Sequence, residues 1–150
     1  MCLRLLIYRS KSKNMNYKWF IGIDVSKSTL DCCVMLLDQK LFHQQIENTP
    51  RSINQFLKKL EKELTGFSIS NTLFCMEHTG IYNIHLLNIL HQSDANIWLE
   101  SAIHIIKSMG VQRGKNDIVD AFRIAKFAYK NRDDVKLWIP KRKIITQEFY

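Results

Sequence analysis

The sequence predicts an α/β domain built on a mixed five-stranded sheet flanked by helices. Three short apolar stretches joined by polar turns come first, between residues 19 and 47, and they indicate an antiparallel meander. Apolar and amphipathic stretches then alternate up to about residue 130, which is typical of parallel strands joined by helices. The length of 150 residues leaves room for about one domain.

Short apolar runs rich in β-branched and aromatic residues define the strands. The first run reads WFIGIDV and the fourth reads TLFCM, and polar turns separate the first three runs from one another. We therefore expect five strands, at residues 19–25, 30–37, 41–47, 72–76 and 96–99.

Helix signals lie between these strands. Thr49-Pro50 combines a hydroxyl cap with proline at the first helical position, and apolar residues follow at helical spacing until Gly66. Further helices are expected over residues 81–91 and 103–109, and a long amphipathic helix from a cap at Asn116 to about Lys130. The resulting order, β-β-β-α-β-α-β-α, is that of the ribonuclease-H-like fold.

The net charge of +8 is concentrated at the two ends of the chain. Residues 1–18 contain five basic side chains and no acid, and residues 101–150 contain eleven basic and five acidic ones. Basic ends of this kind suit a polyanion such as nucleic acid, because each phosphate contact releases condensed counterions. A well-solvated basic surface is an equally good explanation.

The composition argues against a secreted, membrane or zinc protein. The cysteines Cys2, Cys32, Cys33 and Cys75 form no C-x-x-C pair, as expected for reduced thiols, and the five histidines lack zinc spacing. No export signal is visible, and nothing approaches the roughly 18 apolar residues of a membrane span. We therefore expect a cytoplasmic protein without a membrane partner.

Four acids occupy positions where solubility does not require them. Asp24 interrupts the apolar first strand, Glu77 ends the fourth, and Asp117 and Asp120 lie three apart at the predicted start of the last helix. Carboxylates from separate elements suit Mg²⁺, and a pair of such ions performs phosphoryl transfer. Each acid alone also has an ordinary explanation, such as a favourable charge at a helix N-terminus.

Three motifs that contain these acids resemble one family. They read IGIDVSK around Asp24, MEHTGIY around Glu77 and RGKNDIVDA around Asp117 and Asp120. Over residues 17–140 the chain resembles the N-terminal, RuvC-like domain of DEDD-type insertion-sequence transposases, a group related to the Piv-type DNA invertases. The resemblance implies that Asp24, Glu77, Asp117 and Asp120 are catalytic ligands of Mg²⁺, with Mn²⁺ as a substitute.

The same resemblance implies the partners of the chain. Members of the family transpose DNA, and some are guided by a structured RNA. Lys107, Arg113 and Lys115 lie near the third motif and are candidate phosphate contacts, although a solvated loop is an equally good explanation for them. An apolar surface is expected around Trp138, and association of copies of the chain through it into a homo-oligomer is a further possibility.

The resemblance also divides the chain. We expect a basic arm at 1–16, the RuvC-like domain at 17–140 and the start of a truncated helical linker at 141–150. Family members continue into a second domain that carries a nucleophilic serine. No serine of this sequence matches that residue, so we expect an incomplete recombinase.

Two other functions are compatible with the sequence. One is a remnant that only binds nucleic acid. The other is an actin-like or sugar-kinase-like lobe that binds ATP, which shares the G-I-D-x-[ST] opening. That second fold requires two lobes and glycine-rich loops, and the chain has five glycines.

Overall fold

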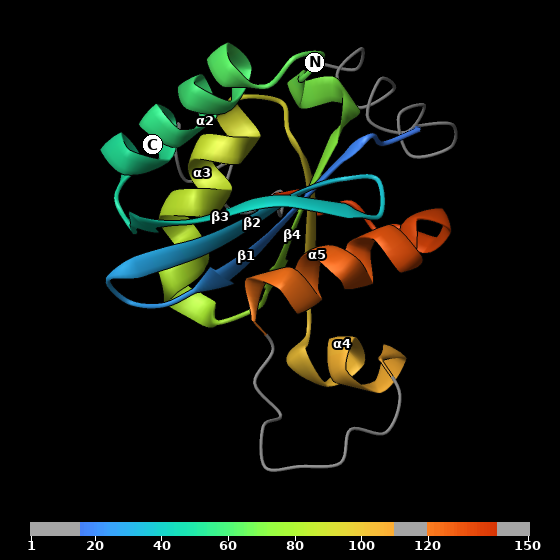
Figure 1. Cartoon of the computed structure of the whole chain (residues 1–150). Coiled ribbons are helices and arrows are strands. Elements are labelled where there is room, and N and C mark those ends of the chain that lie inside the picture. The colour runs from blue at the N-terminus through green and yellow to red at the C-terminus, as the bar shows by residue number, and fades with distance from the viewer. Residues whose placement is uncertain (1–15, 110–119, 141–150) are drawn as a thin grey trace, which may run out of the picture.

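The computed structural model describes residues 16–109 and 120–140, and it contains the expected sheet. Five strands lie in the order β3-β2-β1-β4-β5 (Figure 1). Their bounds are Trp19–Val25 (β1), Thr29–Leu36 (β2), Gln39–Glu47 (β3), Thr72–Glu77 (β4) and Asn96–Glu100 (β5). All five predicted strands are therefore present, and their ends agree with the prediction to within two residues.

The sheet is mixed, as predicted. Strands β1, β2 and β3 form the antiparallel meander, whereas β4 runs parallel to β1 and β5 runs parallel to β4. Because β1, β4 and β5 point the same way, their carboxyl ends meet at one edge of the sheet.

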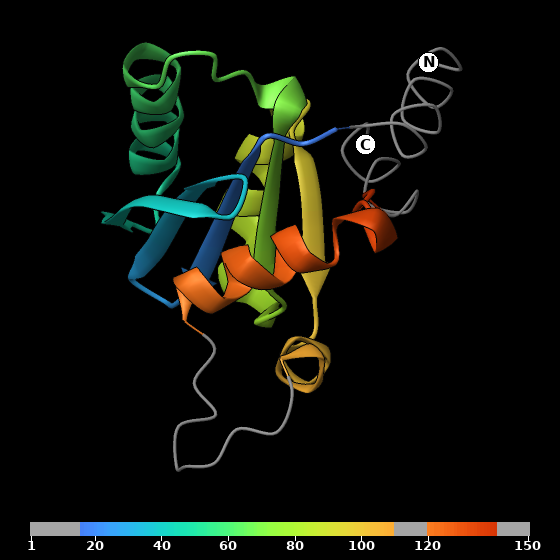
Figure 2. The ribbon, with the colours of Figure 1, turned by 45° about the vertical axis from the view of Figure 1, so that its right-hand side comes forward.

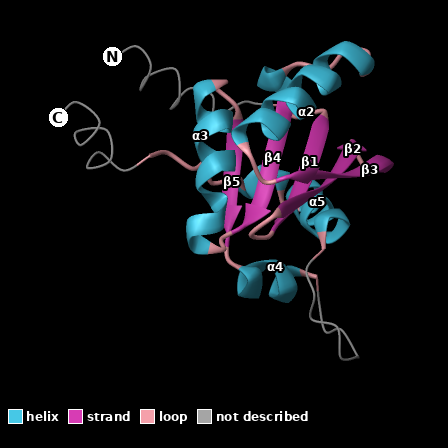
Figure 3. Ribbon diagram, turned by 90° about the vertical axis from the view of Figure 1, so that its left-hand side faces the viewer, coloured by secondary structure: helices cyan, strands magenta, loops and turns pink. Residues whose placement is uncertain are grey.

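Four α-helices of the described residues connect and cover the strands: α2 (Pro50–Glu63), α3 (Ile84–Gln92), α4 (Ala102–Ser108) and α5 (Ala121–Lys130). Short 3₁₀ turns occupy Ile69–Asn71 (η1), Gly80–Asn83 (η2) and Arg132–Asp134 (η3). The predicted cap of α2 is confirmed, since the Thr49 side chain accepts the backbone N–H of Ser52. Helices α2 and α3 lie on one face of the sheet and α5 lies on the other (Figures 2 and 3).

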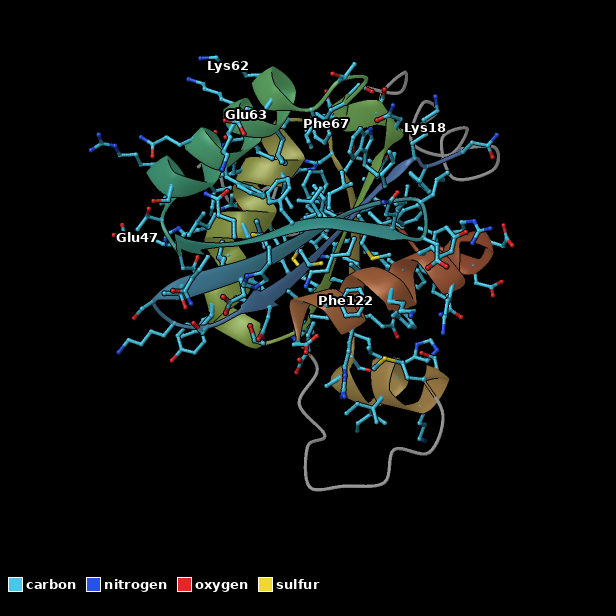
Figure 4. All side chains as sticks on the ribbon, in the orientation of Figure 1. Lys18, Glu47, Lys62, Glu63, Phe67 and Phe122 are labelled. Carbon is cyan, nitrogen blue, oxygen red and sulfur yellow. The ribbon has the colours of Figure 1, made fainter. Side chains whose placement is uncertain are left out.

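Side chains of α2 and α3 form the core on the first face of the sheet. Ile53 and Leu60 of α2 are buried there against the odd-numbered positions of β1, such as Ile21. Phe67 packs edge-on against Trp19, whereas the charged end of α2 points outward (Figure 4). The helical spacing of apolar residues in α2 thus produces the buried stripe that the sequence predicted.

Helix α5 packs on the second face, directly against β1. Its small residues Ala121 and Ala125 lie over Gly22. A Cβ atom on Gly22 would lie 2.2 Å from the carbonyl oxygen of Ala121 and 2.3 Å from the backbone nitrogen of Ala125. A glycine in the middle of a strand here permits the backbones of strand and helix to touch.

The predicted start of the last helix is wrong. The helix begins at Ala121 rather than after an Asn116 cap, and Asp120 is its N-cap, with an extended backbone at φ −86° and ψ 173°. The Asp120 carboxylate accepts the backbone N–H of Arg123 at 2.9 Å, as an N-cap does. The helix therefore starts after Asp120, because a cap residue lies outside the helical backbone. Asp120 is therefore not on the face of a first helical turn.

Several expectations fall outside the described residues. These are the basic arm up to residue 15, the Asn116 cap and the linker from residue 141. Within the described part, Cys32, Cys33 and Cys75 are free and buried, and no helix is long and apolar enough to cross a membrane. Trp138 is half-buried, and its ring packs edge-on against His91.

Candidate metal centre

Three of the four predicted acids lie around the carboxyl edge of the parallel strands. Asp24 is the penultimate residue of β1, Glu77 is the last residue of β4, and Asp120 caps α5. The register pairs Ile23 of β1 with Met76 of β4, so Asp24 and Glu77 occupy the next positions along two neighbouring strands. Neighbouring strands lie about 4.8 Å apart, which brings these two carboxylates side by side.

Both strand acids point toward the face that carries α5. Side chains alternate along a strand, and Gly22, two residues before Asp24, faces Ala121 of α5. Cys75, two residues before Glu77, belongs to the core on the same face. The close contact at Gly22 therefore also brings the N-cap of α5, with Asp120, to the side of the sheet where Asp24 lies.

The charges of these acids interact. Burial raises the pKa of Asp24 above its usual value, and the carboxylates of Asp31, Glu77 and Asp120 raise it further by repulsion. Burial also raises the pKa of Glu77. A half-buried carboxylate with three acidic neighbours is a site where a cation would relieve repulsion.

The two central carboxylates have no partner within the described part of the chain. Neither Asp24 nor Glu77 has a side-chain hydrogen bond or ion pair there. Asp120 uses one carboxylate oxygen as the helix cap, which leaves the other oxygen for a ligand. Among the described residues, however, no three acids, histidines or cysteines are already close enough together to hold a metal ion. The described acids approach one another without forming a complete ligand set.

Two further acids, which were not among the four predicted ligands, continue the line of Asp24 and Glu77 across the sheet. Together the four acids form an acidic row. Asp31 of β2 lies opposite Asp24 in the antiparallel register, and Glu100 of β5 lies opposite Glu77 in the parallel register. The order on this face is thus Asp31, Asp24, Glu77, Glu100. Glu100 ends its strand as Glu77 does, which is the sequence signal that could have identified it.

The outer acids differ from the inner ones because side chains donate to them. Asp31 accepts a hydrogen bond from Gln45 at 3.1 Å, and His43 Nε2 lies 3.7 Å from the same oxygen. Glu100 accepts the indole N–H of Trp98 at 3.0 Å through one oxygen and contacts His104 Nδ1 through the other. As far as the described residues go, the row therefore has two unpartnered acids at its centre and a partnered acid at each end.

Two buried asparagines hold the loops that follow β1 and β4. Asn83 donates to the carbonyl of Glu77 at 3.1 Å and accepts both the backbone N–H and the hydroxyl of Thr79. Asn48 donates to the carbonyls of Ser26 and Tyr82, at 2.8 and 3.0 Å, and so joins the two loops. These bonds fix the backbone that carries the central acids.

The remaining predicted site residues are only partly described. Lys107 is exposed on α4, which follows the carboxyl end of β5. Asp117, Arg113 and Lys115 lie outside the described residues. The structure thus brings Asp24, Glu77 and Asp120 together and leaves the position of the fourth acid open.

Among solved structures, the chain is similar to T. thermophilus RuvC in complex with Holliday junction substrate. The TM-score is 0.55 at 11% identity, over 83% of this chain and 100% of that chain. A further Thermus thermophilus RuvC structure matches with a TM-score of 0.49 at 11% identity, over 78% of this chain and 97% of that one. The first match confirms the RuvC-like, ribonuclease-H-like fold.

Sequence comparison assigns the family. A search among curated proteins found no match. The model of the IS110-type DEDD family, described as transposase, matches residues 21–147 and so spans all four predicted acids. Because this match covers most of the chain, the chain belongs to the DEDD transposases of the IS110 type.

Proposed function

We propose that this chain is the domain of a DNA transposase that cleaves and transfers DNA phosphodiesters with bound Mg²⁺. The observation that carries the proposal is the meeting of Asp24, Glu77 and Asp120, from three separate elements, on one face of the sheet. The first two have no partner within the described residues, although both lie half-buried. An unpaired, half-buried carboxylate destabilises the folded state, so a role in stability does not explain these two residues. A site that binds a cation does explain them.

The donor set fits Mg²⁺. This ion takes carboxylate oxygens and retains several waters, so ligands from a few separate elements suffice. Asp24, at the centre of the row, would hold the metal together with Glu77, Asp120 and Asp117. When bound, Mg²⁺ would supply the Lewis acidity that activates the attacking oxygen and stabilises the leaving oxygen of a phosphodiester.

The residues of this chain perform the positioning. Strands β1 and β4 hold Asp24 and Glu77 side by side, and Asn83 fixes the carbonyl of Glu77. Capping of α5 by one oxygen of Asp120 fixes the direction of its other oxygen. A small displacement of any of these elements would move the carboxylates relative to one another and would weaken Mg²⁺ binding, because this ion demands a near-ideal ligand geometry.

DNA is the proposed substrate and partner. One solved structure to which the chain is similar is T. thermophilus RuvC in complex with Holliday junction substrate. The chain carries a net charge of +8, and Lys107 lies exposed on α4 beyond the carboxyl edge. Arg113 and Lys115 are proposed as further phosphate contacts, since cations near a carboxylate site offset its repulsion of DNA.

A Mn²⁺ titration of the purified chain, followed by electron paramagnetic resonance, tests the proposal. Asp24→Asn and Asp117→Asn should each abolish binding, and Asp38→Asn is the matched control. Asp38 is an exposed acid in the turn between β2 and β3, at the opposite end of the sheet from Asp24. Its substitution should leave binding unchanged.

The second step measures Mg²⁺-dependent cleavage of a fluorescently labelled Holliday junction and of a linear duplex. Cleavage by the wild type and none by Asp24→Asn is the expected result. Equal Mn²⁺ binding by Asp24→Asn and the wild type would refute the metal site. DNA binding without any metal binding would instead identify a domain that only binds nucleic acid.

A further inference from the structure

The pair formed by Glu100 and His104 lies next to the proposed metal ligands but is not one of them. Glu100 is the last residue of β5 and lies opposite Glu77, about 4.8 Å away across the sheet. His104 is on the first turn of α4, which follows β5 and lies against α5 (Figures 1 and 2). The pair is thus one strand further along the row of acids.

Glu100 is fully engaged by donors. One oxygen accepts the indole N–H of Trp98 and the other contacts His104 Nδ1, and the Glu100 side chain is 15% exposed. Trp98 is itself buried against Phe127 of α5, so this end of the arrangement is fixed by the core. A carboxylate with both oxygens occupied is a poor candidate for a further metal ligand.

Glu100 therefore determines how His104 is presented. With Nδ1 directed at Glu100, the other ring nitrogen, Nε2, is left for a different partner. The His104 ring packs edge-on against Phe127, which restricts its rotation, and its side chain is 53% exposed. An imidazole held at one nitrogen and open at the other is oriented for binding.

The surroundings of His104 indicate what it binds. Lys107, three residues later, is exposed on the same side of α4. The nearby row of acids repels DNA, so a strand that reaches the metal ions needs donors at the edge of the row. A phosphate oxygen is the ligand that suits both an imidazolium N–H and a lysine ammonium.

We propose that Glu100 is a positioning residue that holds His104 so that His104 Nε2 donates to a phosphate of the DNA strand at the carboxylate site. This inference rests on the proposed function. According to this inference, α4 contacts the DNA and places the DNA strand beside Glu77. His104 and Lys107 then bind the phosphate backbone together. An imidazolium donates from both ring nitrogens, so the contact with Glu100 and the contact with the phosphate coexist.

A separation-of-function variant tests the proposal. In His104→Asn the amide nitrogen lies as many bonds from Cα as Nδ1 does, so the variant retains the donor to Glu100 and removes the outward nitrogen. His43→Asn is the matched control, because His43 also lies beside an acid of the row, at its other end. Glu100→Ala removes the holding carboxylate and leaves His104 in place.

Three quantities are measured for each variant: the midpoint of thermal unfolding, Mn²⁺ affinity, and Kd for a fluorescein-labelled Holliday junction in Ca²⁺. We expect His104→Asn to retain the first two and to raise Kd about ten-fold, as for one lost charge-assisted hydrogen bond. Glu100→Ala should raise Kd comparably, and His43→Asn should have no effect. In ¹⁵N spectra of the wild type, addition of DNA should shift the His104 Nε2 signal, and this shift should be absent in Glu100→Ala.

Each contrary outcome has a distinct meaning. Wild-type Kd in His104→Asn, or an Nε2 signal unmoved by DNA, overturns the phosphate contact even if one variant fails to fold. Wild-type Kd in Glu100→Ala overturns the positioning role. Loss of Mn²⁺ binding in His104→Asn would place His104 in the metal site instead. A wild-type chain that binds neither Mn²⁺ nor DNA would refute the proposed function itself.

Discussion

Replacement of Gly22 by alanine would insert a methyl group into the contact between β1 and α5. The added Cβ would lie 2.2 Å from the carbonyl oxygen of Ala121, whereas ordinary contacts begin at 3.4 Å, so about 1.2 Å of separation is missing. The obstructing atoms belong to the backbone and cannot rotate away. Helix α5 must therefore move as a unit, at a cost near the upper end of the usual overpacking range, about 3 kcal/mol.

The same displacement acts on the metal site. Asp120 is the cap of α5 and Asp24 lies two residues after Gly22, so a shift of the helix separates the two carboxylates. Urea denaturation should show the loss of about 3 kcal/mol, which corresponds to roughly 10 °C in the unfolding midpoint. Mn²⁺ titration should show loss of binding in the same variant.

Gly66→Ala is the control for this experiment. Gly66 has φ +82° and no neighbour within 4 Å of an added Cβ, so its substitution strains only the local backbone. It should cost about 1 kcal/mol and leave Mn²⁺ binding unchanged. If Gly22→Ala is as stable as this control and binds Mn²⁺ like the wild type, α5 does not rest on β1 as described.

Substitutions at three positions test the site further. Asp24→Asn should raise the stability of the metal-free chain at neutral pH by about 0.2–1 kcal/mol, because it removes the repulsion of Asp31 directly opposite. The raised pKa of Asp24 means that the folded state binds a proton before the unfolded state as pH falls. The metal-free wild type should therefore gain stability between neutral pH and the usual carboxyl pKa of about 4, and urea denaturation across this window should show a flatter profile for Asp24→Asn. Asp120→Asn should retain the cap and lose Mn²⁺ binding, whereas Asp120→Ala should also lose about 1 kcal/mol; a stable Asp120→Asn with full Mn²⁺ affinity would remove Asp120 from the ligand set. Asn83→Ala should cost about 1–3 kcal/mol and weaken Mn²⁺ binding, since the carbonyl of Glu77 loses its donor; unchanged Mn²⁺ affinity would show that this bond does not position the acid.

Local patterns were sufficient for most elements of the fold. The run WFIGIDV forms β1, and the Thr49-Pro50 signal caps α2, because strand and cap preferences act within a few residues. The last helix was predicted to start too early. Both Asn and Asp are residue types that cap helices. In the structure Asp120 is the cap, and the first helical residue, Ala121, packs against Gly22.

The sequence by itself determined the family, the strands and the three motifs that carry the predicted acids, because these are properties of residue type and spacing. Only the tertiary structure decided which acids are neighbours. The register across four strands placed Asp31 and Glu100 in one row with Asp24 and Glu77, and it gave the outer pair donors from β3, β5 and α4. Glu100 takes its partners from two and four residues away, and Asp31 takes Gln45 from the neighbouring strand. Spacing along the chain nevertheless does not show that these held acids flank Asp24 and Glu77, because strand order and register decide which residues are neighbours across a sheet.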